Sequence, residues 1–288
     1  MKREIDRPTF IVSPHRSGST LLYGILGAHP DLGYYNRANR RMPQFPAVAR
    51  LATRLGFRDD PMEAQRIWDR FWDGTDDVMD ASHATPEACE WYRESVARVL
   101  ELRGARRFLA KYPRLSLRLA WLDAIFPDAI FLHLVRDWRA VVNSTTARIV
   151  KREQRGGGWF GVRIPGWQDP ELENQPPEVV AGRVYRYVTK ALETEGPKFG
   201  DRYFRVSYED ICARPRQVVR EIADRCDWPW SDEFESTVPA ELRSANAKWR
   251  ERLDPELIEQ IRSEDPEFYA RYESADATPV AGSGSGSA

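Results

Sequence analysis

Short apolar segments alternate with helical patterns along this chain, and this alternation restricts the possible folds more than any other feature. Buried strands are predicted at residues 9–12, 31–35, 108–111, 129–135 and 203–208. Parallel strands must be joined by long crossover connections, which are usually helices, so this order favours a parallel sheet with helices on both faces. We therefore expect an α/β fold whose ligands bind at the carboxyl ends of the strands.

Two long segments interrupt the alternation within what we predict to be a single domain of residues 1–281. Residues 50–102 are Trp-rich and mostly helical in pattern, which predicts a helical insert. Residues 151–182 contain a glycine run, tryptophans and prolines, and a connection of this length is predicted to be a lid or substrate loop. Residues 282–288 read GSGSGSA and are predicted to be a flexible linker outside the domain.

The composition argues against several classes of protein. Hydrophobic residues make up 42% of the 288 residues, and 43 basic residues nearly balance 44 acidic ones. We expect no nucleic-acid partner, because proteins that bind nucleic acids usually carry a basic excess. The three cysteines form no C-x-x-C pair, and no apolar segment is long enough to span a membrane. These features predict a cytoplasmic protein without disulfide bonds or a zinc site, and they leave its oligomeric state open.

The loop after the first strand has the pattern of an anion-binding loop. Residues 13–20 read SPHRSGST and lie between the strand and a helix, whose first N–H groups would face a bound anion. The spacing from Ser13 to Gly18 matches the phosphate loop of nucleotide triphosphatases, but Ser19 replaces its lysine. This replacement disfavours magnesium–ATP chemistry, and Arg16 could supply the cation instead. A capped turn without a ligand is the alternative interpretation.

A second candidate anion site follows the strand at 129–135. The strand ends in Arg136, and Ser144 lies eight residues further on, two turns into the next predicted helix. An arginine can form a fork of hydrogen bonds to a phosphate, and a serine hydroxyl can donate another. Arg136 could also be a surface charge at a strand end. Two such patterns occur in this order, each at a strand–helix junction, and this argues against a chance match.

Together these two segments resemble the 5′-phosphosulfate loop and the 3′-phosphate motif of soluble, bacterial-type sulfotransferases that use 3′-phosphoadenosine 5′-phosphosulfate (PAPS). Lys111-Tyr112-Pro113 is similar to the K-x-P segment of the family, and Tyr208-Glu209-Asp210 with Pro215 is similar to its Y-E-D-x-x-x-x-P segment. Residues 246–253 resemble the C-terminal element that closes over the nucleotide. Trp138 departs from the family pattern, where Pro or Gly is common.

The resemblance implies a fold, a reaction and a set of site residues. The fold is a P-loop-like parallel sheet flanked by helices, and the reaction moves a sulfuryl group from PAPS to a hydroxyl or amine, leaving adenosine 3′,5′-bisphosphate (PAP). No metal is implied. Charge stabilisation during transfer is expected from Arg16 and Lys111. The residues implied to bind the donor are Arg16, Ser17, Gly18, Ser19, Thr20, Arg136, Ser144 and Tyr208.

The base that would deprotonate the acceptor is not evident from the sequence. No Glu appears shortly after the second strand, and Pro113 stands where many members have a His. His83, with Asp80 to orient it, is the tentative base, although a solvated helix-entry residue is the alternative. Asp80 itself, or an acceptor that is already ionised, would also suffice. The remaining histidines are predicted to be structural: His15, His29 and His133.

The acceptor is expected to be a small molecule. Tryptophans gather in the predicted insert and lid, where their rings could enclose an aromatic or apolar acceptor: Trp68, Trp72, Trp91, Trp159 and Trp167. A glycan, a lipid or a peptide tyrosine stays open. Two other functions also stay open. The missing Glu suggests an inactive nucleotide-binding or regulatory module of the same fold, and the loop geometry alone would suit a small-molecule kinase.

Overall fold

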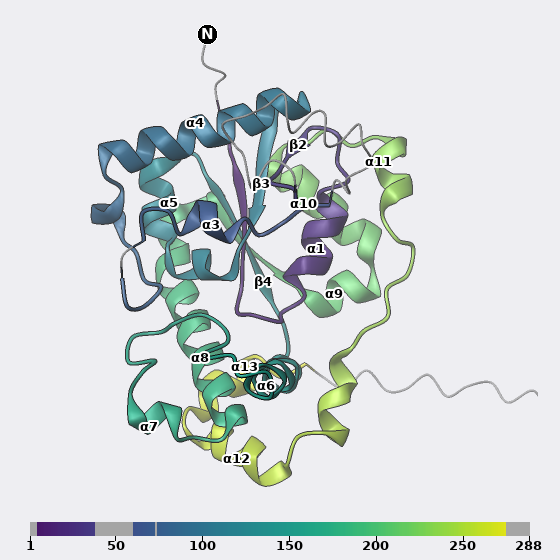
Figure 1. Cartoon of the computed structure of the whole chain (residues 1–288). Coiled ribbons are helices and arrows are strands. Elements are labelled where there is room, and N and C mark those ends of the chain that lie inside the picture. Colours follow the sequence, from purple (N-terminus) through teal and green to yellow (C-terminus); the bar gives the residue numbers. More distant parts are fainter. Residues whose placement is uncertain (1–4, 38–59, 73, 275–288) are drawn as a thin grey trace, which may run out of the picture.

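A five-stranded parallel sheet forms the centre of the computed structural model, which describes residues 5–37, 60–72 and 74–274 (Figure 1). The strands are β1 (Thr9–Val12), β2 (Leu32–Gly33), β3 (Arg107–Lys111), β4 (Ile130–Val135) and β5 (Tyr203–Ser207). Their order in the sheet is β2-β3-β1-β4-β5, and every neighbouring pair is parallel. The predicted α/β fold is confirmed.

The strands lie close to their predicted positions, with one difference that bears on function. The last strand was predicted to include Tyr208, but β5 ends at Ser207 and Tyr208 begins the helix α9 (Tyr208–Ala213). The Ser207 hydroxyl accepts a hydrogen bond from the backbone N–H of Asp210, at 3.2 Å, and so caps this helix. The cap places Tyr208 at the carboxyl edge of the sheet.

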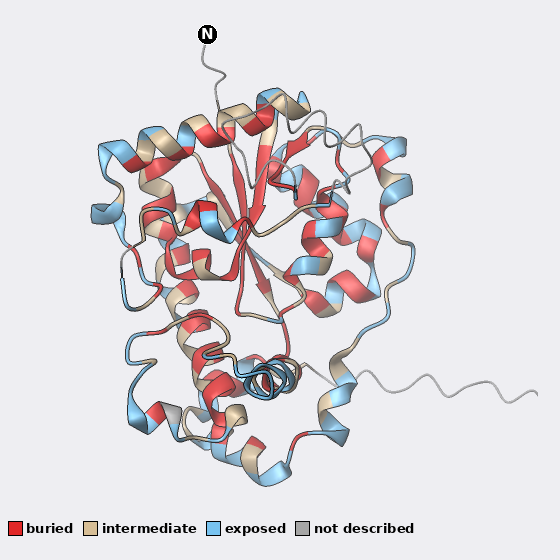
Figure 2. Ribbon diagram, viewed as in Figure 1, coloured by how far each residue is buried: buried red, intermediate tan, exposed pale blue. Residues whose placement is uncertain are grey.

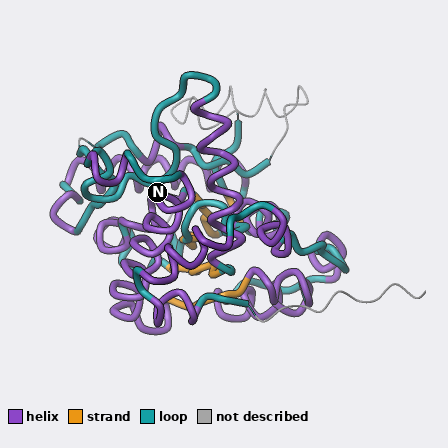
Figure 3. The backbone as a smooth tube through the Cα atoms, turned by 90° about the horizontal axis from the view of Figure 1, so that it is seen from below, coloured by secondary structure: helices purple, strands orange, loops and turns teal. Residues whose placement is uncertain are grey.

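Helices cover both faces of the sheet because its strands are apolar on both sides. Phe10 and Val12 pack with α4 (Pro86–Arg103), α5 (Leu119–Ile125) and α8 (Pro177–Glu195). Ile11, which points to the opposite face, packs with α1 (Ser19–Leu26) and α10 (Pro215–Cys226). Figures 2 and 3 show the strands buried among helices. This arrangement is expected for a parallel sheet, whose continuous apolar strands need cover on both faces.

A further group of helices packs against α8 on the side away from the sheet. It consists of α6 (Trp138–Glu153), α12 (Pro255–Ser263) and α13 (Pro266–Arg271), which lie side by side in Figure 1. Gly182 allows this close packing, because a Cβ at that position would lie 2.7 Å from Ile261. The shorter elements are α3 (Gln65–Trp68), α7 (Pro170–Glu173), α11 (Asp232–Thr237) and the 3-10 turns η1 (Ala81–His83), η2 (Pro113–Leu117), η3 (Gly196–Arg202) and η4 (Asn246–Glu251).

The described part of the predicted insert is less helical than expected, because residues 69–72 and 74–80, between α3 and η1, contain no regular helix. Buried charge explains this departure. Asp77 is fully buried and lies 3.2 Å from the guanidinium of Arg114, and Asp69 lies 3.0 Å from the same group. Arg118, also buried, donates a hydrogen bond to Asp69. The ion pairs of Asp69 and Asp77 with arginines of the segment after β3 hold residues 69–72 and 74–80 in an irregular path.

The same aspartate joins the predicted insert to the predicted lid. The backbone N–H of Arg163 donates to Asp77 Oδ2 at 2.6 Å, and the backbone N–H of Asp77 donates to the carbonyl of Arg163 at 2.8 Å. Residues 50–59 of the predicted insert and the predicted linker at 282–288 lie outside the described residues. Within the described ranges, we find no helix with the length and apolarity needed to cross a bilayer.

Candidate active site

The loop between β1 and α1 is held at both ends by serine hydroxyls. The Ser116 hydroxyl accepts a hydrogen bond from the Ser13 N–H at 2.8 Å and donates one to the Ser13 carbonyl at 3.0 Å. The Ser17 hydroxyl donates to the carbonyl of Pro14 at 2.9 Å. Because the first N–H groups of a helix have no acceptor within the helix, α1 offers them to an anion in front of this fixed loop.

Gly18, which precedes α1, is required by both conformation and space. Its φ of +96° lies in the left-handed region that favours glycine, and a Cβ would lie 2.4 Å from Cδ2 of Tyr208. The ring of Tyr208 therefore packs directly on the loop. This contact brings Tyr208, which the resemblance implies binds the donor, to the predicted 5′-phosphosulfate loop.

Replacing Gly18 with alanine is expected to destabilise the protein by about 2 kcal/mol, because it combines a strained φ with a clash against Tyr208. Binding of PAP should weaken as well, since the loop must shift. Thermal unfolding with and without PAP measures both effects. Gly24→Ala is the matched control, because Gly24 lies within α1 and has open space around its Cβ. That variant should be stabilised slightly; equal behaviour of the two variants would contradict the role of Gly18.

Arg136 joins three segments that the sequence analysis singled out separately. It is only 8% exposed, and its Nη1 donates to the carbonyl of Arg16 at 2.9 Å. Its Nε donates to Oδ1 of Asn246, in η4, at 2.9 Å, and its guanidinium lies 4.1 Å from the ring centre of Tyr208. Burial lowers the pKa of Arg136, but an arginine stays charged at any physiological pH. Arg136 is thus a fixed positive charge at the end of β4.

The two candidate anion sites also meet through Arg16. Its Nε donates to the hydroxyl of Ser144, on α6, at 3.1 Å. Burial, followed by the positive charges of Arg148 and Arg136, lowers the pKa of Arg16. Arg148 follows Ser144 by four residues and so lies on the same face of α6. Three guanidinium groups therefore lie close enough to repel one another, a condition that a bound anion would relieve.

Lys111 approaches the same loop from the end of β3. Its Nζ donates to the hydroxyl of Thr20, in the first turn of α1, at 2.9 Å. The same nitrogen forms an ion pair with Glu63, and the lysine side chain is only 3% exposed. A lysine, a threonine hydroxyl and the N-terminus of α1 therefore converge at one point.

A cavity of about 630 Å³ lies between these groups. Both Gly18 and Arg136 line it, so the two candidate anion sites open into one cavity. The predicted site residues that line it are Arg16, Gly18, Ser19, Thr20, Lys111, Arg136 and Tyr208. Ser17 is buried within the loop, and Ser144 accepts a hydrogen bond from Arg16, which lines the cavity. In the described ranges, no group of three or more His, Cys, Asp or Glu side chains is placed to hold a metal ion.

Glu63 is a site residue that the sequence analysis missed. It is the one carboxylate among the described residues that line the cavity. The backbone N–H of Met62 donates to the carbonyl of Tyr35 at 2.8 Å, so the chain returns here to the carboxyl end of β2. The residues directly after β2 include no acid, so the sequence did not indicate a base there. The only available signal was an acid further along the chain, in a segment without a recognisable pattern.

The structure does not place His83 at this cavity. Its Nδ1 lies 2.9 Å from Oδ1 of Asp80 and 3.2 Å from the backbone nitrogen of that residue. These contacts close η1 as a capping box, in which the first residue and the one three positions later satisfy each other. The predicted pairing of Asp80 with His83 is present, but its role is to cap a turn.

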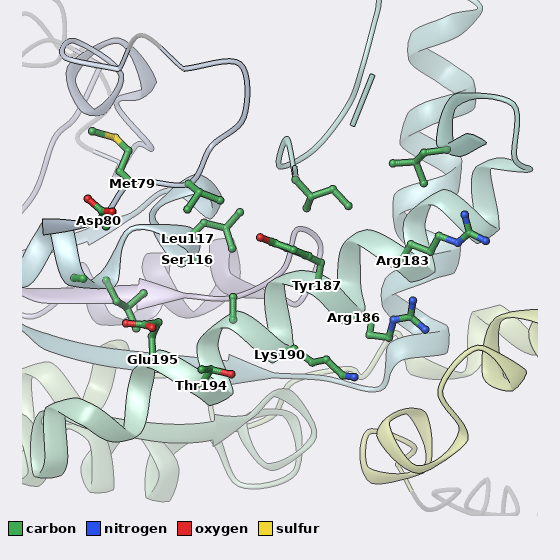
Figure 4. A pocket seen from close by; sticks show the side chains of 16 residues that line it. Met79, Asp80, Ser116, Leu117, Arg183, Arg186, Tyr187, Lys190, Thr194 and Glu195 are labelled. Carbon is green, nitrogen blue, oxygen red and sulfur yellow. The ribbon is translucent and has the colours of Figure 1, made fainter. Parts of the chain in front are cut away.

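Asp80 instead lines a second cavity, of about 640 Å³, behind η2. Arg114 of η2 lines the first cavity, whereas Ser116 and Leu117 line the second. Figure 4 shows the second cavity, with Asp80 at one end and Arg183 of α8 at the other. Its apolar lining includes Met79, Leu117, Leu119, Ile164, Leu172 and Ala191.

The other three histidines divide between the cavity and the core. His15 lines the cavity, and its Nδ1 is buried without a hydrogen-bond partner among the described residues. Burial, followed by the positive charges of Lys111 and Arg114, lowers the pKa of His15 to about 3, so its ring is neutral at pH 7. His29 and His133 are buried in the core, as expected. His15 was predicted to be structural, but it faces the candidate site.

The tryptophans of the predicted insert and lid are also divided between the core and the cavity. Trp68 is buried in the core, and Trp91 packs on Phe71 and Tyr92 beside it. Trp159 lines the cavity, and its ring lies 5.5 Å from that of Trp167. Among the described residues, Trp159 is the one predicted tryptophan that lines the cavity, and Trp167 and Trp72 lie against the cavity-lining Arg163.

Comparison with known proteins matches the part of the chain that contains the candidate site residues. A family model described as "Sulfotransferase family" matches residues 8–232. A protein-tyrosine sulfotransferase of Drosophila melanogaster is 27% identical over 225 residues, which cover 77% of this chain and 38% of that protein. Omega-hydroxy-beta-dihydromenaquinone-9 sulfotransferase Stf3 of Mycobacterium tuberculosis is 26% identical over 152 residues, which cover 51% and 36%. This chain thus spans well under half the length of either relative.

Solved structures show the same fold. Sulfotransferase STF9 from Mycobacterium avium superposes with a TM-score of 0.59 at 16% identity, covering 94% of this chain and 78% of that one. Sulfotransferase STF1 from Mycobacterium tuberculosis gives a TM-score of 0.57, also at 16% identity, and covers 93% and 77%. The family match extends from β1 through both candidate anion sites to α11, and this chain belongs to the sulfotransferase family.

Proposed function

We propose that this protein transfers a sulfuryl group from PAPS to a hydroxyl or amine of an acceptor and releases PAP. One observation supports this most: the Gly18 loop and Arg136 line one cavity, and Arg136 is hydrogen-bonded to the loop carbonyl of Arg16. PAPS carries anionic groups at both its 3′ and 5′ ends, so it needs two anion sites fixed relative to each other. Family membership is in keeping with this chemistry.

The residues divide naturally between the two ends of the donor. Arg136 and Ser144 would bind the 3′-phosphate, with Tyr208 beside the nucleoside. Arg16, which the resemblance implies stabilises charge during transfer, donates to Ser144 and would therefore contact the 3′-phosphate as well. The N–H groups of Ser17, Gly18, Ser19 and Thr20, in the loop and the first turn of α1, would bind the 5′-phosphosulfate. Lys111 would meet the negative charge that grows on the bridging oxygen as the S–O bond breaks.

Glu63 is the best candidate for the base. An acceptor oxygen that forms a bond to sulfur must lose its proton, while the bridging oxygen leaves with the electron pair of the broken bond. Glu63 would take that proton, because it lines the same cavity as the aromatic side chains that would face the acceptor. His15 also lines the cavity, but burial and the positive charges of Lys111 and Arg114 lower its pKa and so disfavour the protonated ring that a base must become. This assignment replaces His83, and it removes the reason for an inactive nucleotide-binding module.

We propose a small-molecule acceptor. The aromatic side chains of Trp159, Phe160 and Tyr112 line the cavity beside Glu63 and would face such a molecule. On this reading residues 151–182 form a lid over the acceptor, within a single domain of residues 1–281. The named relatives sulfate a protein tyrosine and a hydroxylated menaquinone, both of which present a hydroxyl. The three cysteines are free, which suits a reducing compartment such as the cytoplasm.

The proposal predicts that saturating PAP raises the melting temperature, whereas magnesium–ATP does not. Incubation with radiolabelled PAPS and a panel of phenols, alcohols, amines and a tyrosine peptide should then transfer label to at least one acceptor. The absence of a PAP-dependent shift would refute PAPS use. A PAP-dependent shift without label transfer to any acceptor would favour the inactive module, and binding of magnesium–ATP would favour a kinase.

A further inference from the structure

The candidate active site contains far more positive than negative charge. Six arginines and one lysine line the cavity, against a single carboxylate, that of Glu63. The seven cations are Arg16, Lys111, Arg114, Arg136, Arg148, Arg152 and Arg163. This excess exists in a chain whose formal net charge is only -1, so the positive charge is concentrated here. Each of these cations needs either an acid of the protein or an anion of a ligand nearby.

Five of the seven cations have a counter-charge under the proposed function. The donor's 3′-phosphate would face Arg136 and Arg16 together with Arg148, whose charge acts on Arg16. Its 5′-phosphosulfate would face Lys111 and the first N–H groups of α1. Lys111 is paired with Glu63 and lies at the donor's 5′ end. Arg114 is paired with two carboxylates of the protein, at 3.0 and 3.2 Å. Two arginines, Arg152 and Arg163, are left without a counter-ion among the described residues.

Arg152 extends the row of polar side chains on α6 towards the predicted lid. It follows Ser144 and Arg148 at intervals of four residues and therefore lies on the same helix face. Its Nε donates to the carbonyl of Gly158 at 2.7 Å. Within the described ranges, no acid lies within ion-pair distance of Arg152, which is exposed on the cavity wall.

Arg163 lies on the lid and is supported by aromatic rings. Its guanidinium is 4.8 Å from the ring centre of Trp167 and 5.4 Å from that of Trp72, and its backbone is held by Asp77. Where the structure describes the chain, no carboxylate pairs with its side chain either. Half burial and stacking fix the position of this charge. A fixed, unmatched guanidinium is well suited to a carboxylate, sulfate or phosphate group, because no ordering is needed on binding.

Aromatic side chains lie between these two arginines in the sequence and line the same cavity. Trp159 and Phe160 lie between Arg152 and Arg163, and Phe160 packs 5.6 Å from the ring of His15. Flat apolar surfaces flanked by cations complement an aromatic ring with an anionic substituent. A neutral aromatic acceptor would leave both guanidinium groups without an anionic partner among the described residues.

The second cavity does not offer this combination. Its three basic side chains lie along α8 in Figure 4, and each already has an acidic partner. Arg183 and Arg186 both pair with Glu264, and Lys190 pairs with Asp265. The unmatched charge is therefore a property of the candidate active site.

We propose that the acceptor is an aromatic molecule that carries an anionic group in addition to the hydroxyl that receives the sulfuryl group, with Arg152 and Arg163 as its specificity-determining residues. This inference rests on the proposed function, because it counts the donor's charges as already matched. It adds the chemical class of the acceptor, which family membership leaves open.

The test compares two probes that differ only in charge. Isothermal titration of the PAP-saturated protein with 4-hydroxyphenylacetate should give a Kd about tenfold lower than titration with 4-hydroxyphenylacetamide, because only the former carries a charge for a charge-assisted hydrogen bond. Arg163→Gln and Arg152→Gln should each reduce this preference, and the double variant should remove it. Arg155→Gln is the matched control: Arg155 is exposed near the same segment but does not line the cavity, so the preference should persist.

The possible results separate the inference from the function on which it rests. Equal affinity for the acid and the amide, binding of neither probe, or an unchanged preference in the double variant would overturn an anionic acceptor. In each of these cases PAP binding by the same samples would leave the proposed function standing. Absence of PAP binding in the wild-type protein would instead refute the proposed function. Retention of PAP binding in Arg163→Gln would show that the variant is folded.

Discussion

Replacing Arg136 by alanine is expected to weaken PAP binding by about 3 kcal/mol, which is roughly a hundredfold in Kd. The side chain is a nearly buried cation, and it is held rigidly by the carbonyl of Arg16, by Asn246 and by the ring of Tyr208. Alanine would remove the charge meant for the 3′-phosphate and loosen the attachment of the loop. Isothermal titration with PAP measures the change, and the thermal shift caused by PAP should largely disappear.

A matched control separates this effect from a general loss of positive charge. Arg205→Ala removes an arginine from the neighbouring strand β5, where the side chain is exposed and outside the cavity. PAP affinity should then stay close to that of the wild type. Arg136→Lys should bind PAP with intermediate affinity, because lysine keeps the charge but cannot form the forked contact. Unchanged PAP affinity in Arg136→Ala would show that the 3′-phosphate lies elsewhere.

Replacing Glu63 by glutamine is expected to lower kcat by about a hundredfold to ten-thousandfold, the usual contribution of a positioned general base. Glutamine has nearly the same shape but cannot accept the acceptor's proton. PAP affinity should change little, because Glu63 lies beside Lys111 and outside the contacts of Arg136. Initial rates with radiolabelled PAPS, using the best acceptor from the panel, measure the loss.

The dependence on acceptor acidity distinguishes a base from a structural residue. 4-Nitrophenol is largely ionised in mildly alkaline buffer and needs no base, whereas 4-ethylphenol remains protonated there. Glu63→Gln should therefore reduce sulfation of 4-ethylphenol much more than that of 4-nitrophenol. Glu241→Gln, at an exposed position away from the cavity, should affect neither rate. An equal loss with both phenols would assign Glu63 a structural role.

The sheet and the two loops that form the candidate anion sites were predictable because each depends on a short stretch of chain. An apolar strand, a loop that ends in Gly18 and a helix form one continuous unit, and the same is true of β4, Arg136 and α6. Hydrophobic periodicity and helix ends act over a few residues, so they can be recognised without knowledge of the rest of the fold.

The prediction of His83 as the base depended on a local spacing that also has a structural use. Asp80 and His83 stand three residues apart, as an oriented catalytic histidine could, but the same spacing forms a capping box. Nothing in the sequence distinguishes these two uses. The structure does, because η1 lies away from the cavity that holds Gly18 and Arg136.

The sequence by itself determined the α/β architecture, the Gly18 loop and the position of Arg136 at a strand end. Only the tertiary structure decided that Glu63 lies beside Lys111 and that Tyr208 packs on Gly18. It also decided that Arg152 and Arg163 have no acidic partner in the part of the chain that the structure describes. The physical reason is the range of the interactions. Strands, turns and caps form from neighbouring residues, whereas these three features depend on contacts between segments far apart in the chain, such as the hydrogen bond from Met62 to Tyr35.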